Sequence, residues 1–286
     1  INEQEMSIID PVKYSGTDSI GRIGIEKEYE NYLIGQVGSE HVETNARGRV
    51  MRLMSKKDPQ PGQNLTLHLD SNLQQVAYNA LENYRSALIA IDVKSGGILA
   101  MVSTPSYNPN AFVSGIGKKH YAALINSADR PLFNRALKGQ YPPGSTIKPI
   151  VALSALENDV ISPNMQVKCS GKIEMYGQTY HCWKEKGHGH MSLKNAIKQS
   201  CDIYFYEVSR LLGVDRLNLT AEKFGLGKKV LGDFFPNEKR GLVPSTSWKK
   251  NALDQSWYLG ETLITGIGQG YIQVNPLQLC IMTAQL

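Results

Sequence analysis

A short segment with two prolines and a glycine limits what this chain can fold into. It reads Tyr141-Pro-Pro-Gly-Ser-Thr-Ile-Lys-Pro-Ile and leads into a helix-like apolar run. Because proline restricts φ and glycine permits unusual backbone angles, the segment predicts a rigid loop that ends where a helix begins. Ser145 and Lys148 have i, i+3 spacing, so this helix would carry both side chains on one face of its first turn.

The Ser145 and Lys148 pair suits nucleophilic catalysis. A free serine is a poor nucleophile near neutral pH and needs a base. A lysine can be that base where its surroundings favour the neutral amine, and a helix N-terminus favours negative charge that develops nearby. The alternative is a serine that caps the helix beside a solvated lysine, and a Ser-x-x-Lys pattern alone does not separate the two interpretations.

Two later segments could serve the same site. Ser200-Cys-Asp-Ile-Tyr-Phe-Tyr precedes an apolar run, so Ser200 could relay a proton and Asp202 could hold the lysine or a substrate amide, although Ser-x-Asp is also a common helix start. Gly266-Ile-Gly-Gln-Gly permits close approach of two backbones, and Asn275-Pro276 predicts the start of a helix. A structural turn at these glycines is equally expected.

The remaining patterns predict helices and strands in two domains. We expect helices at 21–30, 70–81, 148–157 and 191–212, a strand with a turn at 45–53, a strand at 64–69, and a hairpin of 87–92 with 97–102. The stretch between 157 and 191 is rich in Gly, His and Cys and is expected to be irregular. A breaker cluster at 56–62 predicts a linker, so we place one domain at 1–60 and a larger one at 61–286.

Charge and hydropathy exclude some classes of function. The 31 basic and 26 acidic residues give a net charge of +5 without a concentrated basic run, so nucleic-acid binding is not predicted. No stretch approaches the roughly 18 apolar residues that cross a bilayer, and the N-terminus has no signal-peptide pattern. The chain begins without Met and ends inside an apolar run, so we expect both ends to be cut.

Three cysteines and a histidine gather between the two serine segments: Cys169, Cys182, His188 and Cys201. Three sulfurs and one imidazole suit tetrahedral Zn²⁺. Because the spacings are longer than in a Cys-x-x-Cys knuckle, a Cys169–Cys182 disulfide and unpaired core thiols remain alternatives. His181 and His190 are near enough to be alternative ligands, and Cys280 is expected in the core.

Taken in this order, the motifs resemble those of the class B penicillin-binding proteins. These motifs are Pro-Pro-Gly-Ser-Thr-Ile-Lys-Pro, Ser-Cys-Asp, and Gly-Gln-Gly followed by Asn-Pro-Leu-Gln, and Ala100-Met-Val-Ser-Thr-Pro resembles the strand that opens their transpeptidase domain. Three details look most like the penicillin-binding protein 2 group, which acts in cell elongation: Gly24-Ile-Glu-Lys-Glu-Tyr-Glu, Leu33-Ile-Gly-Gln-Val-Gly and Trp183-Lys-Glu-Lys-Gly-His-Gly-His. The resemblance implies an α+β fold: a serine β-lactamase-like transpeptidase domain, C-terminally incomplete, after part of a pedestal (dimerisation) domain.

The resemblance also implies a role for each motif residue. Ser145 would be the nucleophile, acylated by a stem peptide ending in D-Ala-D-Ala or by a β-lactam, and Lys148 would be its general base. Ser200 would shuttle a proton to the leaving amine, and Asp202 completes the same motif. The backbone N–H of Ser145 would form half of the oxyanion hole, and an amine of a neighbouring stem peptide would resolve the acyl-enzyme.

A metal site is implied as well. Some members of the penicillin-binding protein 2 group carry one here, built from aspartate, histidine and cysteine. By approximate spacing, Cys182, His188 and Cys201 match three of those ligands and Cys169 the fourth. The resemblance therefore favours a structural zinc that would fix the second motif, and it implies no cofactor for catalysis.

One motif of the family is not found. After Gln278 the sequence contains no Lys-Thr-Gly, and Lys94-Ser95-Gly96 fits the turn of the predicted hairpin, so we expect the chain alone to be inactive. The resemblance implies an inner-membrane anchor, a periplasmic location, and a membrane glycosyltransferase and elongation-complex scaffold proteins as partners. A hydrolase, such as a D,D-carboxypeptidase or β-lactamase, and a non-catalytic β-lactam sensor remain alternatives.

Overall fold

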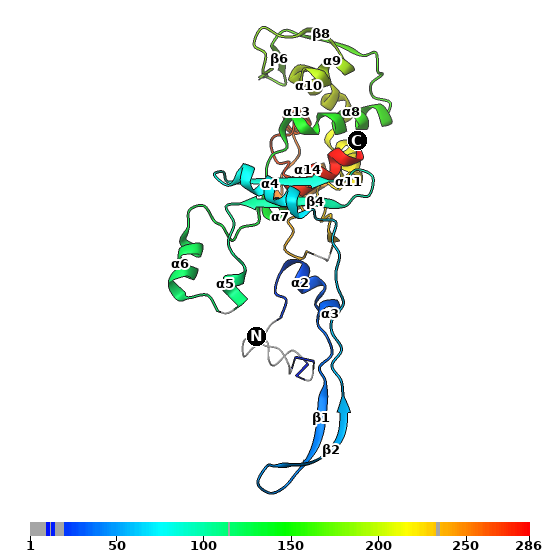
Figure 1. Cartoon of the computed structure of the whole chain (residues 1–286). Helices are drawn as coiled ribbons and strands as arrows, with labels where there is room; N and C mark the ends of the chain where they lie inside the picture. Colours follow the sequence, from blue (N-terminus) through cyan, green and yellow to red (C-terminus); the bar gives the residue numbers. More distant parts are fainter. Residues whose placement is uncertain (1–9, 12, 15–19, 114, 233–234) are drawn as a thin grey trace. The chain divides into compact units, whose positions relative to one another are not determined.

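The computed structural model describes residues 10–11, 13–14, 20–113, 115–232 and 235–286 (Figure 1). The described residues form two compact units. Unit 1 takes its residues from 1–68, 108–118 and 232–236, and unit 2 from 69–107, 119–231 and 237–286. The sequence placed a domain boundary after residue 60, and unit 1 continues along the chain to His68. In the described part of the chain, no helix has both the length and the apolar character needed to cross a membrane.

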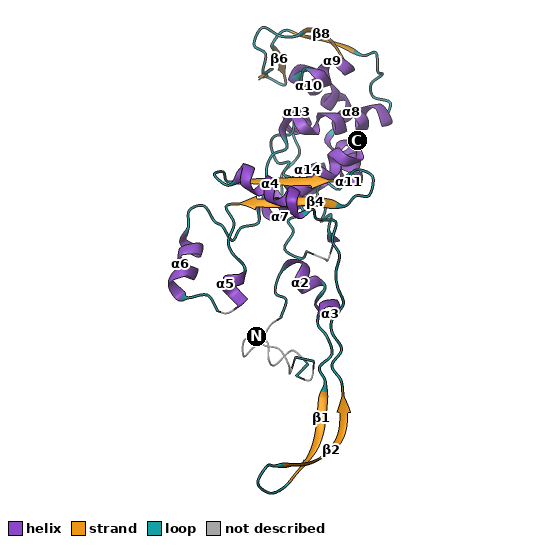
Figure 2. Ribbon diagram, viewed as in Figure 1, coloured by secondary structure: helices purple, strands orange, loops and turns teal. Residues whose placement is uncertain are grey.

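Unit 1 contains short helices and one hairpin (Figure 2). Its elements are α2 (Gly24–Glu28), α3 (Glu30–Leu33), β1 (Ser39–Thr44), β2 (Val50–Lys57) and α5 (Asn110–Val113). The helix predicted at 21–30 forms as the two short helices α2 and α3. The strand with a turn predicted at 45–53 is confirmed, since β1 and β2 pair antiparallel on either side of that turn. The Asn45 side chain accepts hydrogen bonds from the backbone N–H groups of Arg47 and Arg49 at 3.0 and 3.1 Å, so it shapes the turn locally.

The strand predicted at 64–69 is not formed, whereas the helix after it is confirmed. Residues 64–69 have no partner strand in the described structure, and Leu67 and Leu69 are exposed. Alternation indicates a strand only where a neighbouring strand pairs with its backbone groups. In contrast, α4 (Ser71–Leu81) begins as predicted, because the Asp70 side chain accepts hydrogen bonds from two backbone N–H groups of its first turn.

The predicted hairpin forms a two-stranded sheet in unit 2. β3 (Ser86–Ile91) and β4 (Ile98–Thr104) pair antiparallel, and residues 94–96 lie in the turn between them, as expected. Helix α4 packs on β4, α14 (Pro276–Gln285) packs on β3, and α7 (Arg135–Lys138) contacts both strands (Figures 1 and 2). Cys280 of α14 is half-buried, with its Sγ 3.7 Å from the carbonyl oxygen of Ile89.

A group of helices builds the main core of unit 2. They are α8 (Lys148–Glu157), α9 (Leu193–Lys198), α10 (Asp202–Leu212), α11 (Val214–Lys223) and α13 (Leu259–Gly266), whereas α6 (Lys118–Asn126) and α12 (Thr246–Leu253) lie outside this group. Helix α10 is central and contacts α8, α9, α11 and α13. The helix predicted at 148–157 is confirmed. The helix predicted at 191–212 is interrupted, because Ser200 has a left-handed φ of +52° between α9 and α10.

The segment expected to be irregular contains four short strands. β5 (Gln166–Cys169) pairs with β8 (Gly189–Ser192), and β6 (Lys172–Met175) pairs with β7 (Gln178–His181), both antiparallel. Each strand is four residues long and mostly exposed, so the sequence offers no alternation long enough to reveal it. The two hairpin-like pairs bring distant parts of this segment together beside α10.

Candidate active site

The proline-rich loop ends where a helix begins, as its composition predicted. Its serine lies in a 3₁₀ turn, η1 (Gly144–Ile147), that runs directly into α8. Tyr141 exchanges two backbone hydrogen bonds of 2.9 Å with Val274, and the Thr146 hydroxyl donates to the Pro143 carbonyl at 2.7 Å. Ser145 is exposed at this turn. The loop therefore presents the serine hydroxyl on a rigid support.

The glycine segment after α13 makes the close backbone approach that we expected. The N–H of Gly144 donates to the carbonyl oxygen of Gly268 at 2.9 Å. Gly268 has a φ of +76°, and a Cβ atom there would collide with the Gly144 carbonyl oxygen. A larger residue would push the two backbones apart, so this glycine fixes the position of the turn that carries Ser145.

Lys148 is buried and fully engaged, which rules out the solvated lysine of the alternative interpretation. Its side chain is 2% exposed, and Nζ lies 2.7 Å from Asp202 Oδ1, 3.0 Å from Ser200 Oγ and 2.9 Å from the Ser200 carbonyl oxygen. A buried charge is tolerated when it is paired and its other donors are satisfied, and both conditions hold here. The structure thus brings the Ser-x-x-Lys and Ser-x-Asp segments together, as the sequence analysis expected.

A cleft of about 830 Å³ joins these groups. It is lined by Gly144, Ser145, residues 178–183, Ser200, Asp202, Tyr206, Ile264, Ile267 and Gln269. In the described structure, Lys148 Nζ bonds to Ser200 and Asp202 and not to Ser145 Oγ. Catalytic hydrogen bonds are often incomplete before substrate binds. Ser200, whose Oγ is 3.0 Å from the buried amine, lines the same cleft as the exposed Ser145.

Two aromatic residues of the cleft carry functional contacts that the sequence analysis did not assign. Trp183 donates its backbone N–H to Asp202 Oδ2 at 3.0 Å, and its indole N–H points at two backbone carbonyls. Burial raises the pKa of Tyr206 to about 12, so its hydroxyl stays protonated and donates to the His181 carbonyl oxygen at 3.4 Å. Two signals for Trp183 were present in the sequence: it directly follows a candidate ligand, Cys182, and it opens the stretch Trp183-Lys-Glu-Lys-Gly-His-Gly-His.

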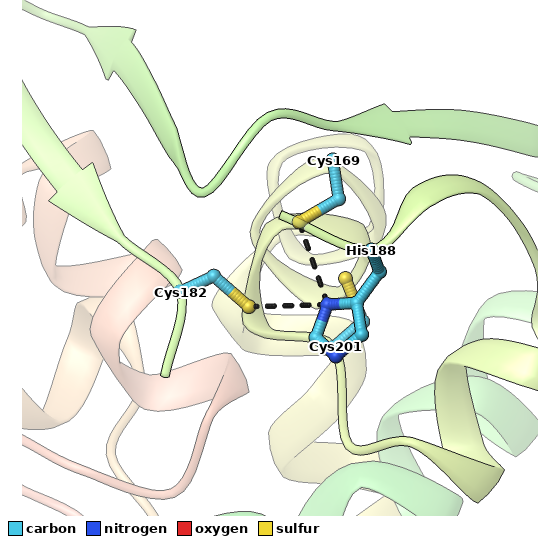
Figure 3. Close-up of side chains that lie close together, drawn as sticks. All are labelled: Cys169, Cys182, His188 and Cys201. Carbon is cyan, nitrogen blue, oxygen red and sulfur yellow. Dashed lines mark hydrogen bonds between the residues drawn. The ribbon is translucent and has the colours of Figure 1, made fainter. Parts of the chain in front are cut away.

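The cysteine cluster adjoins this cleft, because Cys182 also lines it. Figure 3 shows the four side chains of the cluster pointing toward one another. The three sulfurs and the His188 nitrogen all lie within 4.8 Å of one another, and Nδ1 is 3.5 Å from Sγ of both Cys169 and Cys182. Cys169 ends β5, Cys182 follows β7, and Cys201 caps α10. Gly187 permits this fold, because its φ is +74° and a Cβ there would collide with the Cys169 carbonyl oxygen.

The structure speaks against one of the three interpretations of these cysteines. All four cysteines are free thiols, so the disulfide alternative is not formed. Burial lowers the pKa of His188, which favours the neutral imidazole that a metal requires. Burial raises the pKa of Cys201 to about 12, so this thiol needs a nearby cation before it ionises. His181 and His190 are exposed and do not belong to the cluster.

Two family models match the chain. Residues 86–286 match the penicillin binding protein transpeptidase domain, and residues 1–67 match the penicillin-binding protein dimerisation domain. The chain is 43% identical over 286 residues to the peptidoglycan D,D-transpeptidase MrdA of Acinetobacter baumannii, an alignment that covers 99% of this chain and 42% of that relative. It is 30% identical over 270 residues to penicillin-binding protein 3 of Bacillus subtilis, covering 93% of this chain and 38% of that relative. The chain therefore spans less than half the length of these curated relatives.

Solved structures show the same similarity. Pseudomonas aeruginosa PBP2 in complex with WCK 5153 matches with a TM-score of 0.89 at 47% identity, covering 99% of this chain and 59% of that chain. Helicobacter pylori PBP2 in complex with MreC matches with a TM-score of 0.93 at 36% identity, covering 99% of this chain and 53% of that chain.

The buried ion pair generates a stability prediction. We expect Asp202→Ala to lower the unfolding free energy by about 3 kcal/mol, because Lys148 would remain buried without its carboxylate. The double variant Lys148→Met with Asp202→Ala should recover much of this loss, since no uncompensated charge remains. Urea denaturation of the full-length protein measures both values. Equal losses in the single and double variants would show that the ion pair is not what Asp202 contributes.

Proposed function

The chain belongs to the family of penicillin-binding protein transpeptidases, and we propose that the intact protein is a peptidoglycan D,D-transpeptidase that cross-links stem peptides during cell elongation. Family membership confirms the resemblance seen in the sequence and the expected α+β fold with a dimerisation domain. One observation carries the proposal: an exposed serine shares a cleft with Ser200 and Asp202, which bind the buried Lys148.

Acylation would use these groups in sequence. Ser145 Oγ attacks the carbonyl carbon of the penultimate D-Ala, and its proton passes to Lys148, which acts as the general base, as the new C–O bond forms. Asp202, 2.7 Å from that amine, stabilises the ammonium that results. The backbone N–H of Ser145 supplies one donor to the oxyanion. Ser200 Oγ, 3.0 Å from Nζ, relays a proton to the leaving nitrogen as the C–N bond breaks and D-Ala departs.

Cross-linking would follow by the reverse proton path. An amine of a neighbouring stem peptide attacks the ester carbonyl and forms the new amide, while its proton passes through the Ser200 and Lys148 pair back to Ser145 Oγ. A β-lactam would acylate the same oxygen by opening its ring, and its retained leaving group would block the second step. In a hydrolase, water would take the place of the acceptor amine.

The relatives support a proposal on partners, and the reaction supports one on location. The Helicobacter pylori relative was solved with MreC, which supports elongation-complex proteins as partners of this protein. We place a membrane glycosyltransferase among them, together with an inner-membrane anchor and a periplasmic active site, because stem peptides are cross-linked outside the cytoplasmic membrane. The match of residues 1–67 to a dimerisation domain supports a role of that region in contacts with other proteins.

The cysteine cluster would hold a structural zinc. Three sulfurs and one imidazole nitrogen fit the tetrahedral preference of Zn²⁺, and four protein ligands leave no open position for chemistry. When bound, the ion would supply the positive charge that keeps the buried thiols ionised. Cys201 stands between Ser200 and Asp202, so a fixed cluster would hold the second motif in place against Lys148.

Acylation by a β-lactam tests the assigned nucleophile. Exposure of the full-length protein to benzylpenicillin should add the mass of one opened β-lactam, because Ser145 is the exposed serine of the cleft, and Ser145→Ala should abolish the adduct. Intact-protein mass spectrometry measures both. Ser95→Ala is the matched control, because Ser95 is an exposed serine of the only Lys-Ser-Gly sequence, and it should keep the adduct.

Each result decides between functions. An adduct that persists in Ser145→Ala, or that disappears in Ser95→Ala, would overturn the assignment of the nucleophile. Formation of cross-linked product from lipid-linked peptidoglycan chains by the full-length protein supports the transpeptidase. Hydrolysis of the terminal D-Ala without cross-linking would instead identify a carboxypeptidase, and acylation without either product would identify a β-lactam sensor.

Metal analysis tests the zinc proposal. The full-length protein, purified without chelator, should contain about one zinc per chain. Cys169→Ser should lose most of it, whereas Cys280→Ser, which removes a thiol outside the cluster, should retain it. Zinc should also be released as the pH falls, because protons compete for the thiolates and the imidazole. A zinc-free parent protein, or equal loss in both variants by inductively coupled plasma mass spectrometry, would contradict the proposal.

A further inference from the structure

We propose that Trp183 is a positioning residue for the Lys148 site: its two N–H groups hold the same acceptors that bind the lysine amine. The inference rests on the proposed function, because it concerns the base of that reaction. Trp183 lines the cleft and follows Cys182, a residue of the cysteine cluster. No motif of the sequence analysis assigned it a role in chemistry.

Trp183 and Lys148 share two acceptor groups. The indole Nε1–H donates to the Ser200 carbonyl oxygen at 3.1 Å and to the Gln199 carbonyl oxygen at 3.0 Å, and Lys148 Nζ bonds to the same Ser200 oxygen at 2.9 Å. The backbone N–H of Trp183 donates to Asp202 Oδ2 at 3.0 Å, while the amine holds Oδ1 at 2.7 Å. Trp183 therefore orients the Asp202 carboxylate, and its indole N–H shares the Ser200 carbonyl oxygen with the Lys148 amine.

The indole contact stabilises an unusual backbone conformation at Ser200. Its φ of +52° lies in the left-handed region, which a serine adopts only when its surroundings favour it. This angle turns the Gln199 and Ser200 carbonyls to the same indole donor and places Ser200 Oγ against the amine. Without the donor, the two carbonyls would lose the hydrogen bond that holds this turn.

Apolar packing does not explain where the indole lies. The side chain of Trp183 is 64% exposed, so burial contributes little to its position. One ring edge contacts His188, with ring centroids 5.3 Å apart in a T-shaped arrangement. The remaining fixed contacts are the hydrogen bonds to the Ser200 turn, and they explain why an exposed tryptophan adopts one orientation at the wall of the cleft.

The loss of the indole donor should change the chemistry more than the fold. With its carbonyl no longer shared, Ser200 becomes a stronger acceptor for the protonated amine, and acylation requires the neutral amine. Acylation should therefore become slower at neutral pH, and the pH at which it is half-maximal should move upward. A side chain that only supports the fold would change stability without moving this midpoint.

The test compares Trp183→Phe with Trp257→Phe in the full-length protein. Each variant removes one indole N–H donor, and Trp257 Nε1 donates to Thr262 Oγ1 at 2.8 Å outside the cleft. Stopped-flow measurements with a fluorescent penicillin separate the dissociation constant of the initial complex from the acylation rate constant, and are repeated across pH. We expect Trp183→Phe to raise the midpoint by about half a pH unit and, as a consequence, to slow acylation about threefold at neutral pH. The dissociation constant should stay within about twofold, and Trp257→Phe should match the parent.

A second substitution separates the donor from the ring. Replacing Trp183 by β-(3-benzothienyl)alanine keeps the shape and removes only the N–H group, so it should reproduce the slower acylation and the raised midpoint with an unchanged melting temperature. A parent-like rate and midpoint in this variant would overturn the inference and leave the transpeptidase proposal intact. An equal midpoint shift in Trp257→Phe would also overturn it. A parent protein that is not acylated would instead overturn the proposed function, and the inference with it.

Discussion

The rest of the site depends on one interaction, the pairing of the buried Lys148 amine with Asp202 and Ser200. A charge that is 2% exposed is stable only if nearby groups replace the water that it loses, and here Asp202 and Ser200 do so. These partners come from the start of α10, the most central helix of unit 2. The requirement to pair one lysine therefore ties the start of α8 to the start of α10 and sets the floor of the cleft.

The wall of the cleft is built from a segment with little hydrophobic core of its own. The cysteine cluster brings the ends of β5 and β7 to Cys201 at the start of α10. Trp183 lies between this cluster and the Ser200 turn, with contacts to both. The cluster and the Ser200 turn thus share one short stretch of chain.

The turn that carries Ser145 is positioned by a close approach between two backbone segments. The Gly144 N–H bond to the Gly268 carbonyl joins the serine turn to the end of α13, where any side chain would separate the two segments. The paired backbones of Tyr141 and Val274 extend the same connection. The serine is therefore held by two segments far apart in the sequence, and the exposed hydroxyl needs no hydrogen bond of its own to keep its place.

The sequence by itself determined the local features: the rigid loop before α8, the capped helix α4, the β3–β4 hairpin, and the cysteines and histidine that cluster. Each depends on neighbours within a few residues or on a strong motif, so local rules were sufficient. Only the tertiary structure decided that residues 64–69 form no strand, that Ser200 interrupts a helix, and that Trp183 holds the Lys148 site. These features depend on contacts between distant segments, and the sequence pattern around each of them fits more than one conformation.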